Sequence, residues 1–295
     1  MRLRNTTRAT LTPAARTRTV FNLAWYELLA IFIILAGEGL LFAGYSVLGV
    51  GVQALNIIAV AVIVVALHGE RVELVEVLVL ISIFGVVSFL FGHVSIIYSL
   101  AIVCVMYLPL IVVIPTLPLY LWAAFYGVMY IPITAIVAHR KLSRYDLGLT
   151  GGYRLTYLIP FGILVGVGIG LSEYAILANT PLIPNTSASE LIGFSIVMIF
   201  FVGLVEELLF RVLLQPQFIE RTGAVAGILI TSVLFGALHA IYGNVYELLF
   251  TTGAGIVFGV AFYKTKSLPF VVTMHAVDDI LVFGVLPFLV LALPR

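Results

Sequence analysis

An apolar stretch in the second half of the chain contains the run Glu-Glu-Leu-Leu-Phe-Arg at positions 206–211. In a helix Glu207 and Arg211 are four residues apart, so they share a face and can form an ion pair. Glu206 then points about 100° away from Glu207, toward a different neighbour. One carboxylate is thus paired, and the other is available to accept a proton. The alternative is a helix end at the membrane interface, where these side chains extend into water before Pro216.

Two further apolar stretches contain histidines. His239 ends the run Phe-Gly-Ala-Leu-His, and Phe235 at its start lies on the same helical face. A single histidine in a helix is often a hydrogen-bonded structural residue, so this motif alone leaves both interpretations open. His275 opens the run His-Ala-Val-Asp-Asp, in which Asp278 and Asp279 are adjacent acids. Because His275 and Asp279 are four residues apart, the carboxylate can orient the imidazole, or both groups can face one cavity.

Together these residue types could activate a water molecule inside a membrane protein. Glu206, His239 and His275 fall in three separate apolar stretches. A carboxylate can take a proton from water, while imidazoles hold the water or stabilise the oxyanion that forms. A charged side chain at the centre of a bilayer costs about 2.5–3.5 kcal/mol on insertion scales, so such a cluster needs an explanation.

The composition places these residues in a membrane. Of the 295 residues, 62% are hydrophobic and 10% are charged, and the mean hydropathy is +1.21. Soluble domains carry about 25% charged residues. The composition therefore excludes a water-soluble domain, a disordered chain and a nucleic-acid-binding protein. The formal net charge of +1 selects no partner, and the single cysteine, Cys104, cannot form an internal disulfide.

The apolar stretches predict an all-α fold, a polytopic transmembrane helical bundle of about eight to ten hydrophobic helices. A helix that crosses the bilayer needs about 20 predominantly apolar residues. The stretches are continuous and lack the strict alternation of transmembrane strands. The expected helices are 20–43, 48–67, 74–92, 94–114, 117–138, 155–178, 190–214, 223–242, 247–263 and 268–293.

Basic residues indicate the orientation of the chain. Residues 1–19 contain five arginines and no acidic residue, which favours a cytoplasmic tail over a targeting peptide. We expect a multi-pass protein of the cell membrane with a cytoplasmic N-terminus. The basic segment 139–146 should also be cytoplasmic, but five preceding crossings would place it outside. One of the early runs is therefore expected not to cross fully. We expect it within 94–138, where four prolines, including Pro132, can break helices.

The three motifs resemble those of the CAAX-prenyl-endopeptidase and bacteriocin-processing-protein (CPBP) family. That family has Glu-Glu-x-x-x-Arg, Phe-x-x-x-His and His-x-x-x-Asn/Asp in this order, and the segment 144–149, Arg-Tyr-Asp-Leu-Gly-Leu, resembles its upstream Leu-Gly-Leu element. The resemblance covers roughly 190–285. It suggests three regions: a basic cytoplasmic tail (1–19), N-terminal transmembrane helices of unknown role (20–146) and a CPBP-like catalytic transmembrane domain (147–295).

This resemblance implies a metal-independent intramembrane endopeptidase with a glutamate as general base. Glu206 would activate water, His239 would help to hold it, and His275 and Asp279 would occupy the positions of the oxyanion stabilisers. The supporting positions would be Glu207, Arg211, Phe235 and Asp278. The partners would be the lipid bilayer and a membrane-associated peptide or protein, such as a prenylated protein or a leader peptide, and no nucleic acid.

One position departs from the motif of the members that act on prenylated proteins, which usually have asparagine where this chain has Asp279. An asparagine amide donates a hydrogen bond to an oxyanion, whereas an ionised aspartate repels it. Asp279 could donate only when protonated, or it could instead orient His275. Farnesylated substrates are therefore not assured by the resemblance.

Three other functions remain open. His239, His275 and a carboxylate could bind zinc, but the chain contains no His-Glu-x-x-His motif, and we expect no cofactor. The buried acids, which include Glu27, Glu38 and Glu173, could instead form the proton or ion relay of a transporter. The inverted repeats found in many transporters are missing, however. A non-catalytic membrane scaffold would keep the same polar cluster for structural reasons.

The motif spacing also sets a geometric condition. Glu206 lies about 14 Å before the expected helix break near Pro216, whereas His239 lies about 25 Å after Thr222, at roughly 1.5 Å per residue. For the two to meet, the connection 215–222 must project beyond the bilayer, or these helices must tilt or break. We expect a water-accessible cavity that opens to the cytoplasmic side, because non-helical backbone at membrane depth must line water or be buried in protein.

Overall fold

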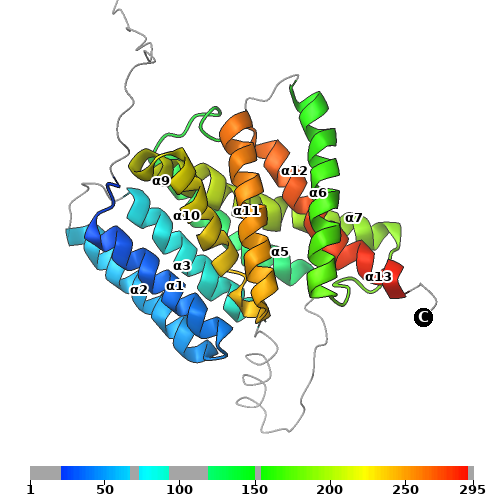
Figure 1. The fold of residues 1–295 in the computed structure, drawn as a ribbon, viewed down its shortest axis with the longest axis horizontal. Helices are drawn as coiled ribbons and strands as arrows, with labels where there is room; N and C mark the ends of the chain where they lie inside the picture. The colour runs from blue at the N-terminus through cyan, green and yellow to red at the C-terminus, as the bar shows by residue number, and fades with distance from the viewer. Residues whose placement is uncertain (1–20, 67–72, 93–118, 150–153, 292–295) are drawn as a thin grey trace, which may run out of the picture.

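A bundle of α-helices makes up the described part of the chain (Figure 1). The computed structural model describes residues 21–66, 73–92, 119–149 and 154–291, and no β-strand occurs among them. Seven helices in these ranges are long and apolar enough to cross a membrane. The expected all-α, polytopic transmembrane bundle is confirmed. The tail 1–19 and the expected helix 94–114 lie outside the described residues.

The helix bounds follow the apolar stretches closely. The α-helices are α1 (Trp25–Phe42), α2 (Ser46–Ala66), α3 (Glu73–Gly92), α5 (Leu119–His139), α6 (Leu155–Leu177), α7 (Ala188–Val197), α8 (Leu204–Glu207), α9 (Gln215–Thr222), α10 (Ala224–Ala237), α11 (Val245–Thr265), α12 (Leu268–Asp279) and α13 (Leu286–Leu291). Three π-helical segments join some of them without interruption, at Met198–Gly203, Leu208–Leu214 and Ile280–Val285, and a 3₁₀ turn spans Ala240–Tyr242. Figure 1 shows α1–α3 grouped on one side of the bundle and α6, α12 and α13 on the other.

Polar side chains connect α1, α2 and α3 inside the bundle. Gln53 of α2 donates a hydrogen bond to the Glu38 carboxylate of α1 at 2.8 Å, and Asn56 of α2 donates to the Ser82 hydroxyl of α3 at 2.7 Å. All four side chains are buried. Hydrogen bonds between membrane helices typically contribute about 0.6 kcal/mol each. Glu38, one of the acids that a transporter could use, is thus a partner in a contact between helices.

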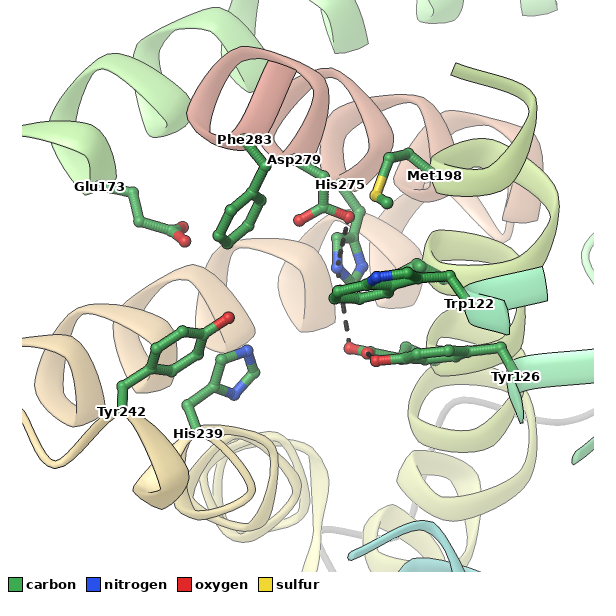
Figure 2. A pocket seen from close by; sticks show the side chains of 11 residues that line it. Trp122, Tyr126, Glu173, Met198, His239, Tyr242, His275, Asp279 and Phe283 are labelled. Atoms are coloured by element: carbon green, nitrogen blue, oxygen red, sulfur yellow. Dashed lines mark hydrogen bonds and ion pairs between the residues drawn. The ribbon is translucent and has the colours of Figure 1, made fainter. Parts of the chain in front are cut away.

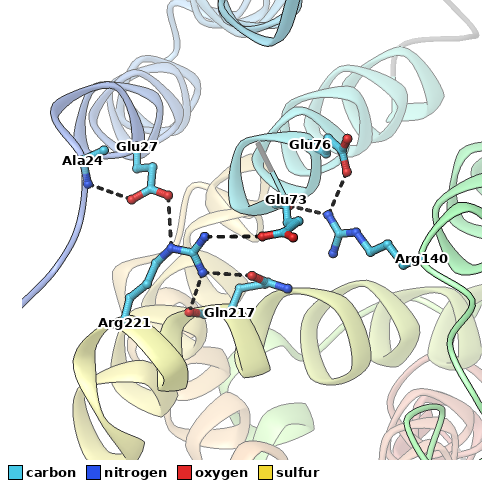
Figure 3. A network of polar contacts seen from close by, with 7 residues as sticks. All are labelled: Ala24, Glu27, Glu73, Glu76, Arg140, Gln217 and Arg221. Carbon is cyan, nitrogen blue, oxygen red and sulfur yellow. Dashed lines mark hydrogen bonds and ion pairs between the residues drawn. The ribbon is translucent and has the colours of Figure 1, made fainter. Parts of the chain in front are cut away.

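Two arginines join four helices at one end of the bundle, which we call the Arg221 end (Figure 3). Arg221 of α9 forms an ion pair of 3.1 Å with Glu27 of α1 and lies 4.0 Å from Glu73 of α3. Arg140, just after α5, forms an ion pair of 2.8 Å with Glu76 of α3. The starts of α1 and α3 and the ends of α5 and α9 therefore lie at this end.

This arrangement accounts for the position of the basic segment 139–146. The start of α3 and the end of α5 lie together at the Arg221 end, so α3 leads away from that end and α5 returns to it. The basic segment then lies at the same end as the start of α1. Residues 94–138 were expected to contain an interrupted helix. Pro132, which lies in this range, does not break α5, because the helix continues through it to His139. The expectation of a break is wrong for that residue.

The helix that carries Glu206 is longer than expected. It runs through α7, α8, α9 and two π-helical segments from Ala188 to Thr222 without a break at Pro216. Pro216 comes just after the π-helical segment Leu208–Leu214, where the α-helical hydrogen-bond pattern is already interrupted. Gly223 (φ +83°) then turns the chain into α10. At roughly 1.5 Å per residue, Glu206 and His239 each lie about 24–25 Å from this turn. The geometric condition is thus met, because residues 215–222 continue as helix α9 and bring Glu206 and His239 to similar distances from the turn at Gly223.

Helices α6 and α12 run in the same direction and are in close contact along a row of glycines on α6. Gly162 faces Phe270, and Gly170 faces the backbone of Asp278. Between them, a Cβ atom on Gly166 would lie only 2.5 Å from the carbonyl oxygen of Met274. Small residues spaced by four allow membrane helices to approach this closely. The glycine row therefore fixes the position of α12, which carries the third motif.

Candidate active site

The three motifs meet at one cavity of about 70 Å³ (Figure 2). Its walls come from α5, α6, the helix Ala188–Thr222, the turn after α10, α12 and the π-helical segment that follows α12. The predicted residues that line it are Glu206, His239, His275 and Asp279. A polar cavity of this volume has room for several water molecules.

Both adjacent glutamates contact the same histidine. Glu207 Oε1 lies 2.9 Å from His275 Nδ1, and Glu206 Oε2 lies 3.7 Å from His275 Nε2. The expectation that Glu206 would turn to a different neighbour is therefore wrong for this contact. The two nitrogens lie on different edges of the imidazole, so carboxylates that leave the helix in different directions reach one ring.

Glu207 also forms the expected ion pair with Arg211, with a distance of 3.1 Å between Oε2 and Nε. Neither side chain has any exposed surface. The Arg211 guanidinium lies 4.9 Å from the ring centre of Phe235 and 5.7 Å from that of Phe258, and such cation–π contacts are strongest away from water. The alternative of a helix end at the membrane interface is wrong, because the pair is buried in mid-helix.

His275 is held on several sides. Its Nε2 atom lies 3.7 Å from Asp279 Oδ2, as the four-residue spacing predicted. The imidazole stacks on Phe258, with ring centres 5.4 Å apart and planes at 20°. Because Glu207 binds Nδ1, Nε2 is the nitrogen that faces Glu206 and Asp279. Because the Glu207 carboxylate accepts from Nδ1–H, Nε2 can donate to a group in the cavity only when the ring is doubly protonated.

His239 faces the cavity from the end of α10. Its Nδ1 atom lies 3.0 Å from the carbonyl oxygen of Phe235. A carbonyl oxygen only accepts hydrogen bonds, so Nδ1 must carry the proton, and in the neutral ring Nε2 is an acceptor. The ring stacks on Tyr242, with planes at 20° and centres 6.1 Å apart. Figure 2 shows His239 across the cavity from Tyr126.

Asp278 points toward α6, away from its neighbour Asp279. It is buried, and its carboxyl group interacts with that of Glu173 on α6. Glu173 lines the cavity. The adjacent acids of the third motif therefore have different surroundings, as the adjacent glutamates do.

Several lining residues were not predicted from the sequence. Tyr126 and Trp122 come from α5, Tyr242 follows α10, and Phe283 follows α12. The Tyr126 hydroxyl donates a hydrogen bond to Glu206 Oε1 at 3.3 Å. No sequence pattern distinguishes Tyr126 from the other aromatic residues of an apolar stretch. Its place in the site depends on how α5 packs.

The segment 144–149 contacts the start of α12. The Gly148 carbonyl accepts a hydrogen bond from the Leu268 amide at 3.0 Å, and Gly148 has φ +69°. Asp146 Oδ2 accepts from the amide and the hydroxyl of Ser143, at 2.8 and 2.7 Å. These bonds lower the pKa of Asp146 below its ordinary value. The Leu-Gly-Leu element thus forms an ordered turn against the helix that carries His275.

The segment that contains the three motifs matches a model of a known protein family. Residues 188–281 match the family model "Type II CAAX prenyl endopeptidase Rce1-like". The matched segment is about a third of the chain and contains all three motifs. The resemblance to the CPBP family is confirmed. Comparisons with curated proteins and with solved structures give no match.

The match supports a CAAX-protease-like intramembrane endopeptidase, and with the apolar helices it supports a multi-pass membrane protein. A bilayer and a peptide substrate are the partners that such a protein requires. In the described ranges, no three histidine, cysteine, aspartate or glutamate side chains converge as ligands for a metal ion.

Proposed function

We propose that the protein is a metal-independent intramembrane endopeptidase in which Glu206 is the general base. This proposal rests on the observation that the two adjacent carboxylates have different contacts. Glu207 is committed to Arg211 and to His275 Nδ1. Glu206 lines the cavity together with His239 and His275 and is free of any ion pair with an arginine among the described contacts.

In the proposed reaction, Glu206 takes a proton from a water molecule in the cavity. The water oxygen forms a bond with the carbonyl carbon of the scissile peptide, and the carbonyl oxygen becomes an oxyanion. Glu206 then returns its proton to the peptide nitrogen as the C–N bond breaks, which releases an amine and a carboxylic acid. A positioned group of this kind typically accelerates a reaction 10²–10⁴-fold.

The histidines are proposed to bind the water and the oxyanion. In the neutral ring His239 Nε2 is an acceptor, which suits it to hold the attacking water. His275 in its doubly protonated form, through Nε2, and a protonated Asp279 would donate to the oxyanion from the opposite side of the cavity. Donors that are held in place before the reaction are more effective than mobile ones, and the stacking on Phe258 holds the His275 ring.

The substrate is proposed to be a membrane-associated or lipidated peptide, such as a prenylated C-terminus or a leader peptide. We also propose that the Arg221 end faces the cytoplasm, since it carries Arg140 and Arg221 and cytoplasmic ends of membrane helices are enriched in basic residues. The N-terminal end of α1 lies there too, which agrees with the proposed cytoplasmic N-terminus and a location in the cell membrane.

The proposal is tested by comparing peptide N-termini in host membranes by mass spectrometry. The membranes would contain wild type, Glu206→Gln or Glu190→Gln at matched expression. Glu190 lies on α7 of the same long helix and outside the cavity, so its variant controls for loss of a carboxylate. New N-termini should appear with wild type and Glu190→Gln and fall at least about 100-fold with Glu206→Gln.

Absence of new N-termini with all three proteins, relative to host membranes that lack the protein, would contradict the proposal. The scaffold and transporter functions would then be favoured, and proton-coupled uptake into liposomes would separate them. Cleavage that survives Glu206→Gln would retain the protease but exclude Glu206 as its base.

A further inference from the structure

Tyr126 contributes to the cavity from outside the segment that matches the family model. It lies on α5, whereas the match begins at residue 188. Its hydroxyl is hydrogen-bonded to Glu206 Oε1, and the other carboxylate oxygen, Oε2, is directed to His275. Each oxygen of the proposed base therefore has its own neighbour.

We propose that Tyr126 is a positioning residue that holds the Glu206 carboxylate in the orientation needed to take a proton from water. This inference rests on the proposed function. Without the hydroxyl, the carboxylate is held only through Oε2, at 3.7 Å from the His275 ring. It could then rotate about its side-chain bonds and leave the position in which it faces the attacking water. A displacement of about 1 Å in a catalytic group can cost about 100-fold in rate.

The aromatic surroundings of Tyr126 support this role, because they fix the ring itself. Trp122, one turn earlier on α5, stacks on it with planes at 6° and centres 6.0 Å apart. Phe84 of α3 meets it edge to face at 5.5 Å. A phenol ring held by both neighbours can direct its hydroxyl at one point. The hydrogen bond of 3.3 Å is longer than the usual 2.7–2.8 Å, and catalytic hydrogen bonds often shorten when the substrate binds.

The contact between Tyr126 and Phe84 connects helix α3 to the site. Phe84 lies on α3, and Arg140 at the end of α5 is paired with Glu76 of α3. Helix α3 thus packs against α5, and α5 holds Tyr126 against the proposed base. On this inference, the matched segment alone would lack one of the two contacts that orient Glu206.

Tyr130 provides a matched control on the same helix. It lies one turn after Tyr126, and its hydroxyl donates to the carbonyl oxygen of Phe200 in the same long helix that carries Glu206. Tyr126→Phe and Tyr130→Phe therefore each remove one hydroxyl that joins α5 to that helix. Only Tyr126→Phe removes a contact with the proposed base.

The experiment measures steady-state cleavage by full-length protein in liposomes. The probe is a quenched fluorescent peptide with the cleavage sequence identified from wild-type membranes. Tyr126→Phe should lower kcat about tenfold, in line with the loss of one hydrogen bond to a charged group, with little change in KM. Tyr130→Phe should leave kcat within about twofold of wild type. In a Glu206→Gln background, Tyr126→Phe should cause no further loss, because it acts through Glu206.

The results that would overturn the role of Tyr126 differ from those that would overturn the proposed function. Equal kcat values for Tyr126→Phe, Tyr130→Phe and wild type would overturn the inference and leave Glu206-dependent proteolysis standing. An equal loss of kcat in the two single variants would also overturn it, because general packing of α5 would then account for both. Absence of Glu206-dependent cleavage by wild type would overturn the proposed function, and the inference with it.

Discussion

Replacement of Gly166 by alanine should separate α6 from α12 and misplace the third motif. The new Cβ atom would lie 2.5 Å from the Met274 carbonyl oxygen and 2.9 Å from Val277 Cβ. An ordinary contact between carbon and a carbonyl oxygen is about 3.3–3.6 Å, so the helices must separate by about 1 Å. His275 follows Met274 directly and must move with it, so its position relative to the carboxylates of the neighbouring helix changes.

The expected magnitudes follow from this displacement. Introduction of a group into a packed contact typically lowers the free energy of unfolding by about 1–3 kcal/mol. A shift of about 1 Å at His275 should lower the cleavage rate by up to about 100-fold. Gly168→Ala is the matched control, since a Cβ atom at Gly168 meets nothing within 4 Å. In that exposed position, alanine should stabilise the helix by about 0.5–1 kcal/mol.

The assay pairs thermal unfolding in detergent with cleavage of the fluorescent peptide in liposomes. Gly166→Ala should lose stability and activity, whereas Gly168→Ala should lose neither. If Gly166→Ala proves as stable and as active as Gly168→Ala, the argument that the glycine row fixes His275 is refuted.

Three further predictions concern the site itself. Asp279→Asn should preserve or raise kcat for the peptide, since the amide donates to an oxyanion without first being protonated; a severe loss would show that a carboxylate is needed to orient His275. Arg211→Ala should lower the free energy of unfolding in detergent by about 3–5 kcal/mol, because it leaves the buried carboxylate of Glu207 without its arginine partner; a loss under about 1 kcal/mol would contradict the burial of the pair. Dialysis against a strong zinc chelator should leave cleavage within about twofold of the untreated protein, and activity that is lost and then restored by zinc would favour the zinc mechanism.

Much of the fold was predictable because the bilayer imposes a simple rule on the sequence. A crossing helix must be apolar over its whole length, so α6 and the continuous helical run from α12 to α13 were found within a few residues from hydropathy alone. The pairs Glu207–Arg211 and His275–Asp279 were predictable for a similar reason, since contacts within one helix depend only on its period.

The remaining features depend on contacts between helices, which have no local pattern. The sequence did not indicate that the helix would continue past Pro216, because a proline inside a helix usually kinks or ends it. The π-helical segments on both sides of Glu206 also leave no signal in the apolar pattern. Tyr126 was missed because its contact with Glu206 joins residues 80 positions apart.

The bond between Glu27 and Arg221 has a consequence for the synthesis of the protein. The two residues are separated by 194 positions in the chain. Ribosomes add about 5–20 residues per second, so Glu27 leaves the ribosome about 10–40 s before its partner does. During that interval the carboxylate of the first helix must remain at the membrane surface or be neutralised by a proton. Glu27 of α1 therefore reaches its final contact only after Arg221, at the end of α9, has been synthesised.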